Sequence, residues 1–286
     1  MKLIRSLLLA LAVFTTTASA QDEVFVFTAI PDQDESRLEE RFGAVGEYLS
    51  EQLNVDVRYV PVKSYAAAVS AFRNNQVQLA WFGGLTGVQA RARVPGSKAI
   101  AQGEEDQAFW SYIIAHRDTG LERSETLDPR MRGMTFTFGS KSSTSGRLAP
   151  EFHLRDQFGA APDEIFERVG YSGNHSRTLR LVESGAYQLG SINYAVWERE
   201  LDAGNIDTDA VSVIWQTPNY PNYQWSIRGD VDSRFGEGFT ERVQSALLAM
   251  DDPDLLERFP RSAFIPTSND AYRPIEETAR AVGIID

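Results

Sequence analysis

The sequence contains no cysteine and only three histidines in 286 residues. Without cysteine there is no disulfide framework and no thiol to carry a lipid at an export cleavage site, so the fold must rest on its hydrophobic core. An H-E-x-x-H motif or a close pair of histidines would indicate a zinc site, and the sequence contains neither. Basic residues are few: 28 Lys and Arg stand against 40 Asp and Glu, so nucleic acid is a poor partner for this surface.

Long apolar runs are missing too, and the single notable one lies at the N-terminus. Residues 1–20 combine Lys2 and Arg5, an apolar run over residues 7–14 and a final Ala-Ser-Ala, the pattern of a secretory signal peptide. That run is too short to span a bilayer, and no later stretch approaches the roughly 20 apolar residues that spanning requires. We therefore expect cleavage after Ala20 and a soluble protein of the periplasm without a lipid anchor.

The rest of the chain alternates between two kinds of pattern. Extended apolar runs at residues 23–32, 55–62 and 78–84 are separated by helical patterns at 36–54 and 64–75. Such alternation predicts an α/β fold with a mostly parallel sheet. Two further extended stretches precede a polar, turn-rich segment at residues 118–132, after which the alternation restarts.

A return crossing is expected at residues 211–231, which Pro218 and Pro221 stiffen. We assign residues 21–117 and 217–286 to a first lobe and residues 118–216 to a second. Two crossovers of this kind are typical of a hinged clamshell, and the cleft between the lobes is the default ligand site.

The segment "TFGSKSSTSGRLAPEF", residues 137–152, places four hydroxyl residues between a predicted strand and a predicted helix: Ser142, Ser143, Thr144 and Ser145. A helix N-terminus presents unpaired N–H groups and partial positive charge, and hydroxyls add further donors. The segment is therefore a candidate cradle for an oxyanion. The alternative, that one hydroxyl simply caps the helix, is about equally well supported by the pattern.

Three motifs in order resemble one protein family: "LAWFGGLTGVQAR" (79–91), the segment 137–152, and "VGYSGNHSRTLRLVESGAYQLGSINYAVWE" (169–198). Together they resemble the phosphate, phosphite and phosphonate periplasmic binding proteins of ABC transporters, and most nearly the branch labelled as selenate-binding. The resemblance covers nearly the whole mature chain. It implies a two-lobed type II periplasmic clamshell, a transient partnership with an inner-membrane ABC permease, no cofactor and a monomer.

The resemblance also implies a set of ligand-binding residues. They are Tyr65, Phe82, Gly83, Ser142, Ser143, Thr144, Ser145 and His175. Outside the motif, His175 could equally be a solvated residue at a helix start that Asn174 caps.

Position 193 departs from the family pattern. Members that bind phosphonate or phosphite commonly carry Asp where this chain has Asn193 in "GSINYAVWE". A carboxylate accepts a hydrogen bond from a protonated ligand oxygen but repels a fully deprotonated dianion, whereas an amide can donate. If Asn193 lies in the cleft, we expect a selenate- or sulfate-like dianion to be favoured over hydrogenphosphate.

Two other function classes are consistent with parts of the sequence. Hydroxyls and a histidine could suggest a hydrolase, but there is no G-x-S-x-G motif and few possible bases, so we expect no enzyme. The same clamshell could instead present an oxyanion, arsenite included, to a membrane histidine kinase. Docking surfaces are not readable from the sequence, which leaves this alternative open.

Overall fold

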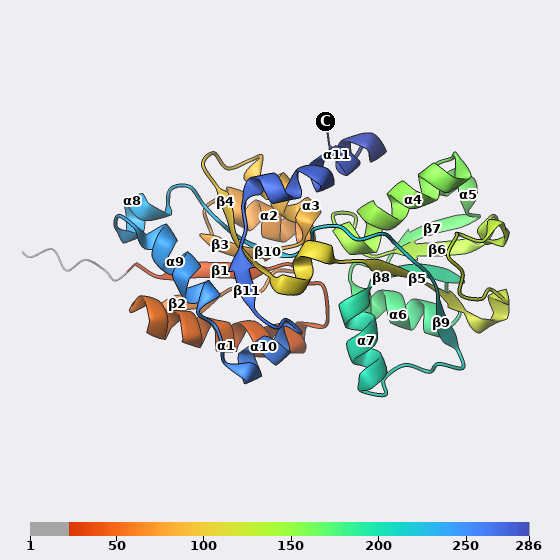
Figure 1. Ribbon diagram of the computed structural model, residues 1–286, viewed down its shortest axis with the longest axis horizontal. Helices are drawn as coiled ribbons and strands as arrows, with labels where there is room; N and C mark the ends of the chain where they lie inside the picture. Colours follow the sequence, from red (N-terminus) through yellow and green to blue (C-terminus); the bar gives the residue numbers. More distant parts are fainter. Residues whose placement is uncertain (1–22, 286) are drawn as a thin grey trace, which may run out of the picture.

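The computed structural model describes residues 23–285, so the expected signal peptide lies outside the described residues. Two lobes lie side by side, each built on one β-sheet with helices on its faces (Figure 1). Within residues 23–285, no helix is both long and apolar enough to cross a membrane.

The first lobe contains a six-stranded sheet of order β11-β4-β10-β3-β1-β2. Its strands are β1 (Phe25–Ala29), β2 (Val57–Tyr59), β3 (Leu79–Phe82), β4 (Lys98–Gly103), β10 (Gln224–Ile227) and β11 (Phe264–Pro266). Its helices are α1 (Glu35–Leu53), α2 (Tyr65–Arg73), α3 (Gly84–Arg91), α8 (Val231–Phe235), α9 (Phe239–Leu248), α10 (Pro253–Arg258) and α11 (Arg273–Val282).

The second lobe contains a five-stranded sheet of order β7-β6-β8-β5-β9. Its strands are β5 (Ser111–His116), β6 (Thr135–Phe138), β7 (Arg168–Tyr171), β8 (Leu189–Asn193) and β9 (Val211–Gln216). Its helices are α4 (Ala149–Phe158), α5 (Pro162–Ile165), α6 (His175–Glu183) and α7 (Tyr194–Asp202).

Both sheets are mixed, which corrects the expectation of a mostly parallel first sheet. Strand β1 runs parallel to β2 and β3, but β10 runs antiparallel to β3 and β4, and β11 antiparallel to β4. Strand β10 returns from the other lobe and therefore enters the sheet from the opposite end. Local alternation of strands and helices does not reveal this long-range return.

The chain passes from the first sheet to the second between Gly103 and Ser111. The assignment of residues 111–116 to the first lobe was wrong, because β5 pairs with β8 and β9 of the second sheet. An apolar run of this kind fits the middle of either sheet, and only the pairing decides. The chain returns between Gln216 and Gln224. The two connecting segments are joined to each other by a β-bridge between Phe109 and Tyr220.

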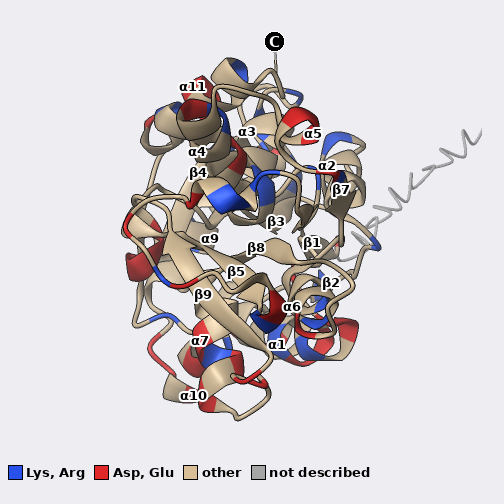
Figure 2. Ribbon diagram, turned by 90° about the vertical axis from the view of Figure 1, so that its right-hand side faces the viewer, with Lys and Arg blue, Asp and Glu red and all other residues tan. Residues whose placement is uncertain are grey.

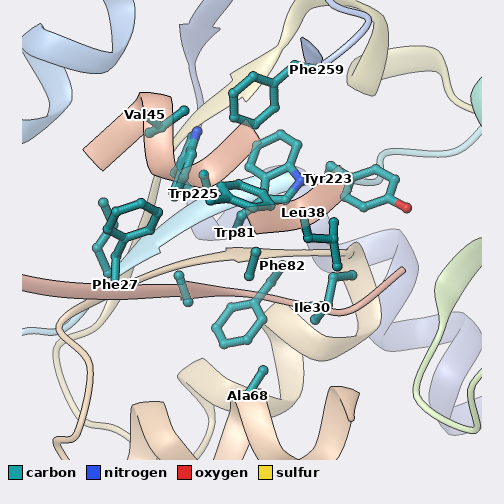
Figure 3. Packing of buried hydrophobic residues seen from close by; sticks show 14 of the residues in the cluster. Phe27, Ile30, Leu38, Val45, Ala68, Trp81, Phe82, Tyr223, Trp225 and Phe259 are labelled. Atoms are coloured by element: carbon teal, nitrogen blue, oxygen red, sulfur yellow. The ribbon is translucent and has the colours of Figure 1, made fainter. Parts of the chain in front are cut away.

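Aromatic packing extends from the core of the first lobe to the junction between the lobes. The Trp81 ring lies 5.2 Å from Trp225 and stacks on Tyr223 at 5.5 Å. Figure 3 shows the Tyr223 hydroxyl pointing out of this cluster. Charged residues lie mostly on helices and loops, whereas strands such as β8 and β9 carry none (Figure 2).

Candidate functional site

The hydroxyl-rich segment forms a tight turn that leads into α4. Ser143 begins a π-helical turn over Thr144–Leu148, and its Oγ accepts a hydrogen bond of 2.9 Å from the Gly146 N–H. The capping interpretation therefore holds for Ser143, although its own hydroxyl proton is still free to donate. Ser143, Thr144 and Ser145 are all buried.

Thr144 joins the two lobes. Its Oγ1 accepts a hydrogen bond of 2.9 Å from the N–H of Leu85, near the start of α3 in the first lobe. The adjacent Gly83 caps α3, and a Cβ built there would lie 3.4 Å from Thr144 Oγ1. The Thr144 oxygen thus satisfies one of the free N–H groups of the facing helix.

His175 is the first residue of α6 and is 1% exposed, which excludes a solvated role. Asn174 caps the helix by accepting from the Arg177 N–H at 2.8 Å. The Nδ1 of His175 accepts from the Asn193 N–H at 3.4 Å, and its Nε2 lies 3.2 Å from Ser145 Oγ.

Burial lowers the pKa of His175 to about 4, against the opposing effect of the Asp32 charge. The ring is therefore neutral at pH 7. Since Nδ1 accepts a hydrogen bond, the proton resides on Nε2, which makes that nitrogen a donor toward Ser145 or toward an oxyanion beside it.

Tyr65 contributes a second donor from the first lobe. It is the first residue of α2, whose N-terminus Ser64 caps by accepting from the Ala67 N–H at 3.1 Å. The hydroxyl is buried and has no hydrogen-bond partner among residues 23–285. Burial, then the charge of Asp32, raises the pKa of Tyr65 well above its usual value. The Ser143 hydroxyl, close enough to interact with Tyr65 but outside hydrogen-bond geometry, opposes the shift. A buried, unpaired hydroxyl costs about 1–3 kcal/mol, which a bound acceptor would relieve.

Asn193 takes part in a hydrogen-bonded chain between the lobes. Its Oδ1 caps α7 by accepting from the Val196 N–H at 2.7 Å, and its Nδ2 donates to the Tyr223 hydroxyl at 3.0 Å. That hydroxyl donates to Asp32 Oδ2 at 2.8 Å. Asp32 is 4% exposed, and its charge acts on both Tyr65 and His175. A carboxylate therefore does face this cluster.

Asp32 was missed by sequence reasoning. The available signal was its position: it follows β1 closely, and ligands of open α/β sheets bind beyond the carboxyl ends of strands. The sequence does not predict a role for Tyr223, because nothing local distinguishes its hydroxyl from those of the other tyrosines.

Two of the expected site side chains lie elsewhere, which corrects those assignments. The Phe82 ring lies in the core of the first lobe, 5.6 Å from Phe72 (Figure 3). Ser142 is half-buried and lines a separate hollow together with residues of α2 and with Gln89 and Arg93. Along β3, Phe82 lies on the opposite face from Trp81 and packs against Phe72 of α2.

Comparisons with known proteins agree with this architecture. Residues 27–272 match the family model described as "ABC transporter, phosphonate, periplasmic substrate-binding protein". The chain is 38% identical over 284 residues to the probable ABC transporter phosphite binding protein PhnD1 of Prochlorococcus marinus (strain MIT 9301), covering 97% of this chain and 96% of the relative.

Solved structures give the same result. The structure of PhnD1 from Prochlorococcus marinus in complex with methylphosphonate has a TM-score of 0.87 and 39% identity, covering 92% of this chain and 99% of that one. A binding protein component of an ABC phosphonate transporter from Pseudomonas aeruginosa has a TM-score of 0.80 and 20% identity, covering 92% and 87%. The protein therefore belongs to the phosphonate-binding family of ABC transporter periplasmic substrate-binding proteins and has its type II fold.

Proposed function

We propose that this protein binds a small tetrahedral oxyanion of the phosphonate and phosphite class between its lobes and delivers it to the permease of an ABC importer. Family membership supports the importer role, and the methylphosphonate bound to PhnD1 supports the ligand class. The observation that carries the proposal is the buried, unpaired Tyr65 hydroxyl of the first lobe beside the hydroxyl turn of the second.

In this proposal the oxyanion receives donors from both lobes. Tyr65 donates from the first lobe, and Ser143, Ser145 and the Nε2–H of His175 donate from the second. A ligand that contacts both lobes stabilises the conformation in which they lie together. We place the hinge at residues 104–110 and 217–223, where the chain crosses between sheets.

Asp32 sets the protonation state of the preferred ligand. A carboxylate beside the anion accepts a hydrogen bond from a protonated oxygen and repels a fully deprotonated dianion. The selenate or sulfate preference expected from Asn193 rested on an amide in place of a carboxylate at position 193, whereas Asp32 supplies a carboxylate from the segment that follows β1. With Asp32 at the site, we propose monoprotonated phosphonate, phosphite or phosphate as the better ligands.

Family membership also bears on whether the protein is an enzyme and on its partner. Its members are binding proteins, so this protein is not an enzyme. Because the family functions with ABC transporters, we propose a permease rather than a histidine kinase as the partner. We further propose that residues 1–20 direct export to the periplasm, that no lipid anchor is attached and that the protein is monomeric.

Calorimetry on refolded protein freed of bound ligand tests this function at pH 7. Methylphosphonate and phosphite should bind at least about 10-fold more tightly than sulfate and selenate, since 1.4 kcal/mol corresponds to tenfold. Asp32→Asn should narrow that difference, and Tyr65→Phe should weaken methylphosphonate binding about 10-fold or more. Tyr171→Phe, a half-exposed tyrosine of the second lobe, serves as control. Absence of binding to all five anions (phosphate included) would contradict the proposal.

A further inference from the structure

A small hollow lies beside the proposed oxyanion site, between the lobes. Its volume is about 20 Å³, and the side chains that line it include Asp32, Arg41, Asn193, Arg199, Tyr223 and Arg261. Arg41 comes from α1 of the first lobe and Arg199 from α7 of the second. The hollow thus brings three arginines and one aspartate together at the junction.

Two of these arginines have carboxylate partners. Arg261 forms a two-pronged ion pair with the buried Asp106, with N–O distances of 2.7 and 2.8 Å. Arg199 lies 3.5 Å from a Glu200 oxygen. The buried Nε of Arg199 nevertheless has no hydrogen-bond partner in the described part of the chain.

Arg41 differs from these two arginines, because it forms no ion pair in the part of the chain that the structure describes. Within residues 23–285, no carboxylate lies within 4.0 Å of its guanidinium, although the residue is only 6% exposed. Instead, the guanidinium lies over the ring of Phe259, 5.5 Å from its centroid. Buried charges in proteins are normally paired, because an uncompensated one retains its full desolvation cost.

The charge on Arg41 persists at neutral pH. Burial lowers its pKa to about 10, which still leaves the group protonated at pH 7. Asp32 partly offsets this charge from beyond ion-pair distance, while its own Oδ2 is engaged by the Tyr223 hydroxyl at 2.8 Å. Glu200 is shared between Arg199 and the closer Arg37, at 2.6 Å. Around the hollow, four arginines (37, 41, 199 and 261) therefore stand against the three carboxylates of Asp32, Asp106 and Glu200, which leaves one positive charge in excess.

We propose that this hollow is a second anion subsite, which takes one small monovalent anionic group between Arg41 and Arg199. Its volume suits a single species about the size of a water molecule, such as chloride. The group is either a free halide or the carboxylate end of a phosphonate whose head occupies the first site, since Asn193, which contacts His175 of the first site, also lines the hollow. Because the two arginines come from different lobes, the anion favours the conformation in which the lobes lie together.

Titration with a halide tests whether a free anion binds in the hollow. Thermal unfolding of the unmodified protein is followed in sodium bromide against sodium methanesulfonate at equal ionic strength. An anion that binds only the folded protein should raise Tm with increasing bromide concentration. Arg41→Gln should abolish this rise, whereas Arg91→Gln should keep it, since Arg91 is a largely buried arginine of α3 that does not line the hollow.

Comparing phosphonoacetate with methylphosphonate distinguishes a free anion in the hollow from a carboxylate that belongs to the ligand. If the group belongs to the ligand, phosphonoacetate should bind at least about 10-fold more tightly than methylphosphonate, and Arg41→Gln should remove that advantage while leaving methylphosphonate affinity nearly unchanged. Should Arg41→Gln fail to fold, the anomalous signal of bromide in crystals of the unmodified protein replaces it.

The proposal is overturned if bromide has no effect beyond ionic strength, gives no anomalous peak in the hollow, and phosphonoacetate shows no Arg41-dependent advantage. The phosphonoacetate comparison rests on the proposed function, but the two bromide measurements do not depend on which oxyanion fills the first site, so failure here is distinguishable from failure of the proposed function.

Discussion

The Asn193 amide donates a hydrogen bond of 3.0 Å to the Tyr223 hydroxyl, and this contact links the second lobe to the first. The hydroxyl in turn donates a hydrogen bond of 2.8 Å to Asp32 Oδ2. The donor at position 193 therefore fixes the direction of the whole chain of hydrogen bonds. An acceptor at that position would leave the hydroxyl between two carboxylates.

Asn193→Asp should weaken the contact between the lobes. The new carboxylate can still cap α7 but no longer donates to Tyr223, and it repels Asp32. We expect methylphosphonate affinity to fall about 10-fold, consistent with about 1–3 kcal/mol for an unsatisfied buried group. Calorimetry at pH 7 measures it. Asn54→Asp adds the same charge at an exposed position, and an equal loss there would refute the explanation.

Thr144→Val removes the acceptor for the Leu85 N–H across the junction. Because that N–H can bind water once the lobes separate, the cost falls mainly on their association. We expect about 10-fold weaker methylphosphonate binding and a larger radius of gyration by X-ray scattering, with little change in urea unfolding. Thr278→Val, whose hydroxyl bonds only within α11, is the control. Unaltered affinity and radius would show that the bond does not hold the lobes together.

His175 should make stability depend on pH. Its pKa of about 4 lies below the value of about 6.5 expected in the unfolded chain, so between these values the unfolded state binds more protons. The contribution is fully present above about pH 6.5 and is lost as the pH falls toward 4, amounting to about 3 kcal/mol.

Urea unfolding of the unmodified protein and of His175→Gln, measured from pH 7 to pH 4, isolates this effect. The variant should show a flatter profile in that range. Burial lowers the pKa of His153 as well, so His153→Gln shows how much of the slope belongs to another histidine. Parallel profiles for the unmodified protein and His175→Gln would contradict the assignment.

Arg261→Ala should destabilise the first lobe strongly. It leaves Asp106 buried without its cation, and Asp106 also accepts hydrogen bonds from the backbone of Gly103 and Tyr223. Breaking a buried pair in this way costs about 3–5 kcal/mol. Urea unfolding of the unmodified protein and the variant measures this loss of stability. Arg273→Ala breaks an exposed pair with Asp270 and should change stability little; similar losses in both variants would argue against burial as the cause.

Gly146→Ala should displace His175. A Cβ at position 146 would lie 3.1 Å from the Cε1 of His175, 3.1 Å from Gly139 Cα and 3.0 Å from Ser143 Oγ. The contact with Gly139 is to a backbone atom, which yields less readily than a side chain, so we expect the His175 ring to move. Methylphosphonate affinity should then fall about 10-fold or more. Gly43→Ala, where a Cβ meets nothing within 4 Å, is the matched control. Retained affinity in Gly146→Ala would mean that the position of His175 is not critical.

Local sequence patterns predicted much of the fold. Residues 36–54 and 64–75 formed helices close to the expected bounds, because apolar spacing and capping residues act over a few neighbours. The short helices α3 and α10 were not identified. The former begins with glycine and has few apolar periodic positions, and the latter has only six residues.

The sequence alone determined the α/β alternation, the hydroxyl turn before α4 and the motif order that indicates the family, since each depends on residues near one another in the chain. Only the tertiary structure decided that β5 pairs in the second sheet. Likewise, only the tertiary structure showed that Asp32 lies near His175 and that Arg41 is buried at the junction with no ion pair among residues 23–285. These relationships join residues from distant segments, and their energies depend on distance and burial, which spacing along the chain does not specify.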